Sequence, residues 1–168
     1  MARESKDSIE NKGCPLCGGS ARIDEGDPIS VECKTCGRYK FAETALATIK
    51  EDDRELLPYL SIHTRQASDR REQVVLHSKN WRDIALSHKD TPITVQARKL
   101  LELAVARSKR GRPVRFDPRS DPPLVNATDP HELGFLLRHL VETGNLEATS
   151  ESWAYIVKAK AWQELQSA

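Results

Sequence analysis

Short runs that alternate apolar and polar residues dominate positions 13–50 of the chain. Residues 21–24 and 29–33 form two such runs around a turn-forming stretch that contains glycine and proline, which predicts a β-hairpin. Residues 39–41 predict a third strand, and residues 42–49 predict a short helix. This helix is expected to pack on the sheet through three apolar residues, Ala45, Leu46 and Ile49.

Helical patterns predominate after position 50. Residues 54–65 and 79–88 predict helices separated by turns, and residues 74–76 predict a short strand.

Two amphipathic helices stand out in the second half of the chain. Pro92 begins the first, because proline at the first helical position loses no hydrogen bond. Asp129 is expected to cap the second, with Glu132 reaching back to the cap, and Gly144 is expected to end it. Their apolar residues are spaced to share one face in each helix: Ile93, Ala97, Leu100, Leu101 and Ala104 in the first, and Leu133, Leu136, Leu137, Leu140 and Val141 in the second.

The remaining segments place these helices in a recognisable order. Residues 111–123 are rich in proline and predict an irregular connector. Residues 146–149 and 153–157 predict strands around a tight polar turn, and residues 158–165 predict a final helix. Helix, connector, helix and hairpin is the order of a winged helix-turn-helix, in which residues 121–128 would supply the middle helix.

Composition favours small packed units over one thick core. The chain has 168 residues, of which 38% are hydrophobic and 30% are charged, against typical values of about 45–50% and about 25%. We therefore expect an α+β, mostly helical fold class in which a four-cysteine ribbon precedes helices and a C-terminal winged-helix-like unit. The predicted domains are a disordered tail at 1–12, the ribbon with its short helix at 13–50, a helical middle segment at 51–90 and the winged-helix-like domain at 91–168.

The apolar runs are too short for a membrane protein. No stretch approaches the roughly 20 apolar residues that span a bilayer, and the first 12 residues lack the apolar middle of a secretion signal. We therefore expect a cytoplasmic protein with no membrane partner. In a reducing compartment, four cysteines are expected to bind metal rather than to form disulfides.

The cysteine spacing is the most specific motif in the chain. The segments 14–17 and 33–36 match C-x2-C-x15-C-x2-C, the spacing of a four-thiolate zinc site. A glycine follows each pair and can adopt the positive φ that such a turn requires. Two disulfides or four unmodified thiols remain the alternatives. Four thiolates close the coordination sphere, so the Zn²⁺ would be structural. The predicted ligands are Cys14, Cys17, Cys33 and Cys36.

A near-neutral total charge conceals a basic middle. Residues 1–62, 63–119 and 120–168 carry net charges of −3, +8 and −4. Polyanion binding depends on the local field more than on the overall balance, so the basic residues of the connector are candidate nucleic-acid contacts, with Phe116 as a stacking face. The alternative is a solvated connector that Asp117 and Asp121 partly neutralise. The candidate contacts are Lys109, Arg110, Arg112, Arg115 and Arg119.

Other residue types give weaker indications. The five histidines are scattered and the motifs of common hydrolases and nucleotide-binding loops are absent, so we expect no enzymatic activity and no small-molecule substrate. The three tryptophans are expected to anchor cores. The polar face of the second amphipathic helix carries two carboxylates, which argues against DNA binding by that helix. That face comprises His131, Glu132, Arg138, His139 and Glu142.

Residues 14–165 resemble the non-catalytic N-terminal module of certain bacterial proteins that continue into a TIR-like or nucleoside-deoxyribosyltransferase-like effector domain. The resemblance is carried by CPLCG and CKTCGRYKF, by LPYLSIHTR as a helix ending at Arg65, by VRFDPRSDPPLVNATDPHELGFLLRHLVETGNLE and by AKAWQEL. It implies a role in prokaryotic defence or phage–host conflict. The chain ends where the effector domain would begin, so sensing, docking or inhibition is expected, unless the chain is a fragment of a longer enzyme.

Two functional hypotheses follow from the sequence. The first is a non-enzymatic, zinc-binding module that binds nucleic acid, DNA or RNA, or regulates another protein, with the basic middle as its main surface. The second is a protein–protein adaptor or scaffold subunit that uses the winged-helix-like surface, because that surface is acidic and its wing is short.

Overall fold

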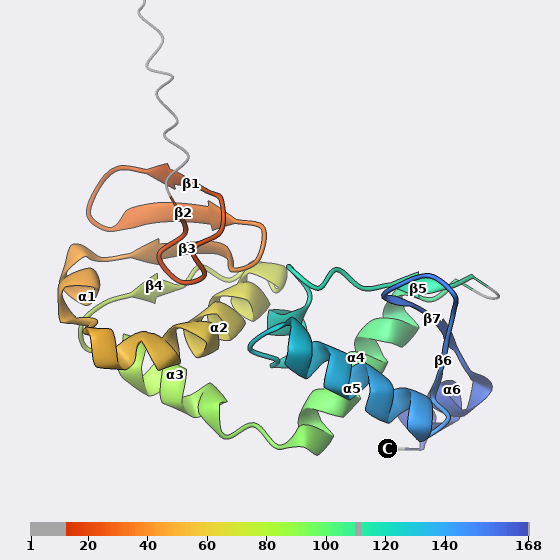
Figure 1. Cartoon of the computed structure of the whole chain (residues 1–168). Helices are drawn as coiled ribbons and strands as arrows, with labels where there is room; N and C mark the ends of the chain where they lie inside the picture. Colours follow the sequence, from red (N-terminus) through yellow and green to blue (C-terminus); the bar gives the residue numbers. More distant parts are fainter. Residues whose placement is uncertain (1–12, 110–111, 168) are drawn as a thin grey trace, which may run out of the picture.

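The chain folds into two halves, each with its own small sheet and helices (Figure 1). The computed structural model describes residues 13–109 and 112–167, and the predicted tail at 1–12 lies outside these residues. We call residues 13–90 the N-terminal half and residues 91–167 the C-terminal half. The α+β class is confirmed, with more residues in helices than in strands.

The N-terminal half is built on a four-stranded sheet. Strands β1 (Ala21–Asp24), β2 (Ile29–Cys33) and β3 (Gly37–Phe41) form an antiparallel meander, as the alternation predicts. Strand β4 (Val75–Leu76) pairs with β3 in parallel, with Phe41 opposite Leu76. The sequence predicts this strand but not its partner, because a pairing across more than 30 residues leaves no local pattern.

Helices cover one face of this sheet. They are α1 (Glu43–Thr48), the 3₁₀ helix η1 (Glu51–Leu56), α2 (Leu57–Asp69) and α3 (Trp81–Lys89). Phe41, Leu60 and Leu76 are fully buried between sheet and helices. Leu46 remains 41% exposed, so the prediction that it packs on the sheet is wrong. The six-residue α1 buries Ala45 alone, because so short a helix presents one narrow face.

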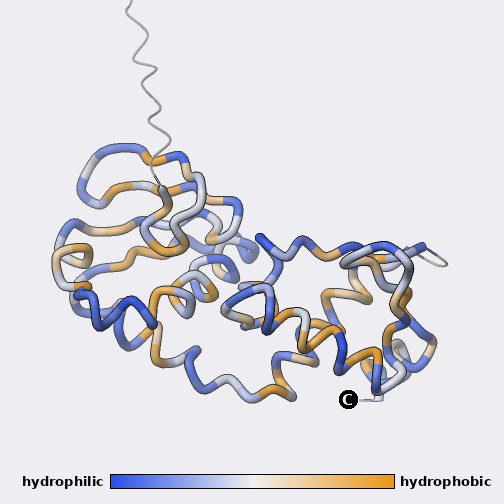
Figure 2. The backbone as a smooth tube through the Cα atoms, in the orientation of Figure 1, coloured by the Kyte–Doolittle hydropathy of each residue, from blue (hydrophilic) through white to orange (hydrophobic). Residues whose placement is uncertain are grey.

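The C-terminal half places a small sheet beside two long helices. Its elements are α4 (Ile93–Arg107), β5 (Val114–Arg115), the 3₁₀ helix η2 (Pro122–Val125), α5 (Pro130–Glu142), β6 (Leu146–Ala148), β7 (Ala154–Val157) and α6 (Ala159–Gln166). The antiparallel sheet has the order β5-β7-β6. The apolar stripes of α4 and α5 meet in the core, where Leu100, Leu133 and Leu137 are fully buried. In Figure 2 apolar segments of both helices line the interior of this half.

In the C-terminal half, the Asp129 cap of α5 is as predicted, whereas the connector and Trp162 differ from the predictions. The Asp129 carboxylate accepts from the Glu132 backbone N–H at 2.8 Å, which confirms the cap. The Glu132 side chain accepts instead from the backbone N–H of Thr128, one residue before the cap. The predicted irregular connector contains strand β5, and the segment 121–128 forms only one short 3₁₀ helix. Trp162 is 40% exposed, so its predicted role as a core anchor is wrong.

The two halves meet through a polar junction centred on Asn126. Its side-chain oxygen accepts from Gln66 Nε2 at 2.5 Å and Lys99 Nζ at 2.6 Å, and its amide donates to Thr91 Oγ1 at 2.9 Å. Its carbonyl oxygen accepts from Gln96 Nε2 at 2.7 Å. One buried amide therefore joins α2 of the N-terminal half to α4 and the segment after η2.

The helices are too short or too polar for a bilayer. Within the described residues, no helix combines the length and the apolar composition that a membrane span requires.

Candidate metal centre

The structure brings the four predicted cysteines together. Their Sγ atoms all lie within 4.8 Å of one another. The Sγ atoms of Cys14 and Cys36 are 3.7 Å apart, and those of Cys17 and Cys33 are 3.6 Å apart. A disulfide needs about 2.05 Å, so these cysteines are unpaired thiols, and Cys17 alone of the four is exposed. The cluster has the donor set and the spacing of a four-coordinate metal site.

Two glycines make the cysteine turns feasible. Gly18 and Gly37 adopt φ values of +70° and +76°, as predicted, a region that other residues enter at a cost. Gly37 is constrained a second time, because a Cβ atom there would lie 2.5 Å from Ser68 Cβ. Gly37 therefore lets the second turn approach α2 closely, whereas no atom of the described residues lies within 4 Å of a Cβ at Gly18.

Two hydroxyl groups contact the cysteine sulfurs. Tyr39 Oη lies 3.1 Å from Cys14 Sγ, and Ser61 Oγ lies 3.1 Å from Cys36 Sγ. Both residues are buried, and Ser61 belongs to α2. Groups in this position orient metal ligands. Sequence reasoning missed them, because only the packing of α2 on the sheet brings Ser61 near the cysteines.

The packing of the thiols changes their acidity. The hydrogen bond with Cys17 lowers the pKa of Cys14 to about 6, and the bond with Cys14 lowers the pKa of Cys33 far below its ordinary value. The same contacts with Cys14 raise the pKa values of Cys17 and Cys36. The lowered pKa values favour the thiolate form of Cys14 and Cys33, and thiolates are the form that binds metal.

The predicted nucleic-acid contacts lie on the connector between α4 and η2. Lys109, Arg112 and Arg119 are exposed and make no ion pair within the described part of the chain. Arg115 is also exposed, but its guanidinium is paired with Glu151. Arg110 lies outside the described residues. Three of the five predicted cations thus present unneutralised charge to solvent.

The predicted stacking role of Phe116 is wrong. Phe116 is only 4% exposed, its ring lies 6.1 Å from that of Tyr155, and the Arg107 guanidinium lies 5.9 Å above it. The residue pairs with the hairpin as well, since its N–H donates to the Trp153 carbonyl. Burial against β7 therefore removes the aromatic face from any ligand.

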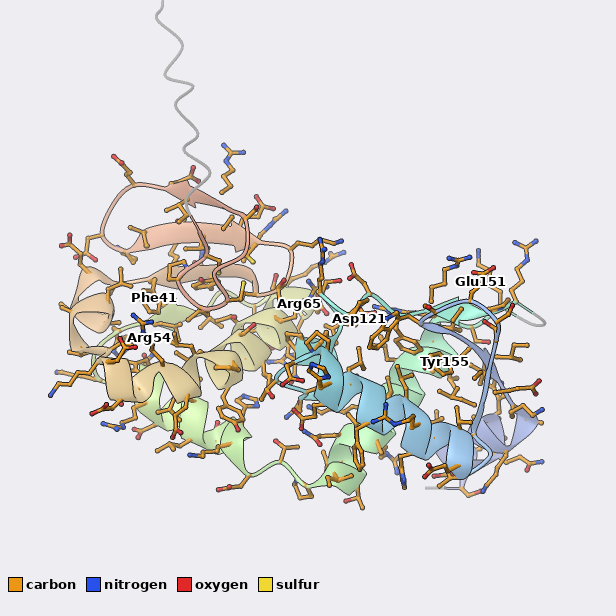
Figure 3. The ribbon with its side chains drawn as sticks, in the orientation of Figure 1. Phe41, Arg54, Arg65, Asp121, Glu151 and Tyr155 are labelled. Carbon is orange, nitrogen blue, oxygen red and sulfur yellow. The ribbon has the colours of Figure 1, made fainter. Side chains whose placement is uncertain are left out.

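The connector is attached to both halves of the protein. Lys34 Nζ lies 2.8 Å from Asp117 Oδ2, and Thr35 Oγ1 donates to the Arg119 carbonyl at 3.0 Å. The two terminal nitrogens of the Arg107 guanidinium donate to the buried Asp121 carboxylate, at 2.6 and 2.9 Å. The two aspartates that the sequence suggested as general neutralising charges therefore have specific partners. Figure 3 shows Arg65 and Asp121 where the halves meet, with Glu151 farther along the C-terminal half.

The outer face of α5 is less charged than its sequence indicates. Glu132 is occupied by Thr128 and by Gln96, whose Nε2 donates to Glu132 Oε1 at 2.7 Å. Phe135, which the sequence analysis did not single out, is 47% exposed on this helix. Of the predicted polar face, His131, Arg138 and Glu142 are exposed, and Glu132 and His139 are half-buried.

Two of the scattered histidines meet in the N-terminal half. His63 Nδ1 of α2 lies 3.1 Å from His88 Nε2 of α3. Burial lowers the pKa of His63 and lowers that of His88 to about 4. The sequence offers no signal for this pair, because 25 residues and a strand separate its members.

Comparison of the chain with protein-family models, with curated proteins and with solved structures finds no match.

Proposed function

We propose that the cysteine cluster binds one structural Zn²⁺. A zinc ion bonded to four sulfurs at about 2.3 Å separates neighbouring sulfurs by about 3.8 Å in a regular tetrahedron, and the observed separations of 3.6 and 3.7 Å are close to this. Zinc is also the usual ion of C-x2-C pairs at this spacing. Cys14, Cys17, Cys33 and Cys36 would supply every ligand, so the ion would stabilise the ribbon and offer no open position for a substrate.

We propose that the chain as a whole is a non-enzymatic module of the cytoplasm that binds nucleic acid. The observation that carries this proposal is the exposed charge of Lys109, Arg112 and Arg119, which have no ion-pair partner within the described residues. They belong to a connector that Thr35 and Arg107 bond at residues 119 and 121. A held cation loses less conformational entropy on binding than a mobile one. Three phosphate contacts predict a log–log salt slope of about −3 on duplex DNA.

The arrangement of the C-terminal half supports a winged-helix-like interpretation. The elements α4, β5, η2, α5, β6 and β7 follow the order of that fold, and β5 joins the β6–β7 hairpin beside β7. Helix α5 would then occupy the position of the recognition helix. Its exposed face carries Arg138 and His131 but also Glu142, so the connector, rather than α5, is proposed as the main contact.

The experiment is a binding titration of labelled duplex DNA, single-stranded DNA and RNA at moderate salt. The test variant changes Lys109, Arg110, Arg112 and Arg119 to Ala, and we expect it to bind at least about 10-fold more weakly than wild type. The control changes four cations of the N-terminal half to Ala: Lys50, Arg54, Lys79 and Lys89. Figure 3 places Arg54 at the other end of the molecule from Glu151. Equal weak binding by all three proteins would remove the nucleic-acid proposal.

A specific observation favours the adaptor as a second candidate. Phe135 exposes 47% of its surface on α5, and the half-buried Trp153 lies beside the same helix, 3.7 Å from a Cβ placed at Gly134. Exposed aromatic residues are typical of protein interfaces. Affinity purification from the native host, carried out with and without nuclease treatment, tests this. A protein recovered with wild type but not with Phe135→Ser would support the adaptor, whereas recovery of nucleic acid alone would exclude it.

The family resemblance extends the proposal to a biological setting. A zinc-stabilised module of this kind would serve prokaryotic defence or phage–host conflict by sensing nucleic acid or by docking an effector. The observation to make is which genes neighbour the gene for this chain. Neighbours unrelated to defence would count against the setting without affecting the binding proposal.

A further inference from the structure

The second cysteine turn contacts the basic connector directly. Lys34 and Thr35 are the two residues between the candidate ligands Cys33 and Cys36. Lys34 Nζ lies 2.8 Å from the Asp117 carboxylate, and Thr35 Oγ1 donates to the Arg119 carbonyl at 3.0 Å. The turn that a bound metal would close is therefore the turn that holds the connector.

The same turn also contacts α2. The Arg65 guanidinium donates to the Lys34 carbonyl and lies 3.4 Å from Asp69, which fixes its direction. Just after the turn, the Arg38 backbone N–H donates to Oγ of Ser68, which also belongs to α2, at 3.0 Å. The turn thus lies between α2 and the connector, and displacement of its backbone would affect both.

Lys34 also determines the local shape of the connector. Asp117 accepts from Lys34 through Oδ2 and from the Arg119 backbone N–H through Oδ1, at 2.9 Å. The Asp117 N–H donates in turn to Asp121, which is held by Arg107. The bond from Lys34 is the main cause that holds the pKa of Asp117 well below its ordinary value, so this carboxylate stays ionised.

We propose that metal binding at the four cysteines orders the connector through Lys34 and Thr35, so that the metal content of the protein controls its affinity for nucleic acid. The control of nucleic-acid affinity rests on the proposed function, whereas the ordering of the connector by metal does not. A four-cysteine ribbon with little apolar content loses its fixed turns without metal. Loss of the turn removes both contacts at once and leaves residues 114–121 with only the bonds that they make within the C-terminal half. Lys34 and Thr35 are positioning residues in this scheme, and neither is a metal ligand.

The first test is hydrogen exchange of the connector amides in the zinc-loaded full chain. The amides of residues 116, 117, 119, 120 and 121 are all hydrogen-bonded and report on connector order. In Lys34→Met/Thr35→Val we expect their exchange to be about 10-fold faster than in wild type, a coupling of ordinary size. Lys40→Met is the control, because it removes one cation of the same ribbon whose side chain, within the described residues, makes no hydrogen bond or ion pair with the connector. Zinc content is measured for each protein.

Chelation completes this test. Adding a chelator to wild type should raise connector exchange to the level of the double variant, while the double variant should change little at the same amides. The proposal is overturned if wild-type connector amides keep their protection after zinc has been removed. It is also overturned if the zinc-loaded double variant exchanges like wild type.

Linkage provides a reciprocal test from the connector side. If metal orders the connector, then loosening the connector must weaken metal binding by the same factor. Asp117→Ala leaves the ribbon sequence intact and should weaken zinc binding about 5- to 10-fold in competition with a chelator, whereas the exposed Glu147→Ala should not. Equal zinc affinity of both variants would contradict the coupling.

Nucleic-acid binding then distinguishes the ordering of the connector by metal from the control of nucleic-acid affinity. At equal zinc content, the double variant should bind duplex DNA about 5-fold more weakly than Lys40→Met, which carries the same net charge because each protein lacks one lysine. If no protein binds nucleic acid, the proposed function fails and the exchange data still decide the coupling. If the variants bind equally while connector exchange differs, the control of affinity by metal is refuted and binding stands.

Discussion

At the scale of single residues, the cysteine cluster depends on backbone conformation as much as on sulfur. The two turns require positive φ at Gly18 and Gly37, but only Gly37 is also pressed against α2. The sequence contains both glycines in equivalent positions, so it cannot distinguish them. Because both glycines have a positive φ and only one contacts α2, the same substitution at each position isolates the effect of that contact on stability.

Gly37→Ala should destabilise the protein more than Gly18→Ala. A left-handed conformation costs a non-glycine residue about 1–2 kcal/mol, and this is the whole penalty at Gly18, where space is open. At Gly37 the new Cβ would also meet Ser68 at 2.5 Å, which adds about 1–3 kcal/mol of overpacking. Chemical denaturation of both zinc-loaded variants measures the difference. Equal losses of unfolding free energy would show that the turn does not press on α2.

Cys33→Ala should abolish metal binding and unfold the ribbon. Removal of one thiolate leaves three ligands, and a small unit of low apolar content depends on its metal to fold. Elemental analysis should give one zinc per wild-type chain and little in the variant, with a lower melting temperature. Ser61→Ala removes a hydroxyl contact to Cys36 but no ligand, so it should retain zinc. Metal-free wild type with an unchanged melting curve would contradict the zinc proposal.

At the scale of elements, strands and helices of several residues follow the sequence pattern, whereas β5 and η2 do not. Helix α5 has a capped start, a stripe of buried leucines and a glycine with positive φ after its end, and every part of this is visible in the sequence. Strand β5 has two residues, and η2 has four, including two prolines. Elements of this length contain only about one period of a strand or helix pattern, so the pattern cannot be recognised and their conformation depends on neighbouring elements.

The contact between α2 and α3 should make stability depend on pH. The pKa values of His63 and His88 are lowered in the folded protein, that of His88 from 6.5 to about 4, by burial and by the nearby Arg70 and Lys99, with Glu72 acting in the opposite direction on His63. The unfolded chain therefore binds more protons between about pH 4 and 6.5, so stability is complete above this window and falls as the pH decreases through it.

His88→Gln should reduce this dependence. Unfolding free energies measured by denaturant titration from pH 4 to 7 should show a shallower slope in the variant than in wild type. His131→Gln, at an exposed position on α5, serves as the control and should keep the wild-type slope. Identical slopes in wild type and His88→Gln would show that the histidine pair does not contribute.

At the scale of the whole molecule, the two halves are joined by polar contacts rather than by a shared apolar core. The buried residues form two separate apolar clusters, one in each half. Between them lie the Asn126 network and the contacts of the second cysteine turn with the connector. Hydrogen bonds depend on geometry more strictly than apolar contacts do, so this junction fixes one relative arrangement of the halves.

Asn126→Gly should weaken the junction. Glycine keeps the left-handed backbone of Asn126, whose φ is +61°, but removes the amide to which Gln66, Lys99 and Thr91 bond. Unpartnered polar groups at a buried site predict a loss of about 2–3 kcal/mol of unfolding free energy. Asn126→Ala should lose about 1 kcal/mol more, because alanine adds the backbone penalty. Urea denaturation followed by circular dichroism measures both. A stable Gly variant would show that other contacts hold the halves together.

The sequence alone determined the parts of this protein that rest on local periodicity or on fixed spacing. The cysteine pairs, the ribbon hairpin, the amphipathic helices α4 and α5 and the final hairpin follow from residues that are close in the chain, because each turn or helical face is formed by neighbouring residues.

Only the tertiary structure decided which distant residues meet. It buried Phe116, paired β4 with β3, brought His63 to His88 and placed the second cysteine turn against the connector. These contacts join residues separated by about 25 to more than 80 positions. Their formation depends on how already formed elements pack, and packing partners are chosen by shape and by hydrogen-bonding geometry in space, which no local pattern in the chain records.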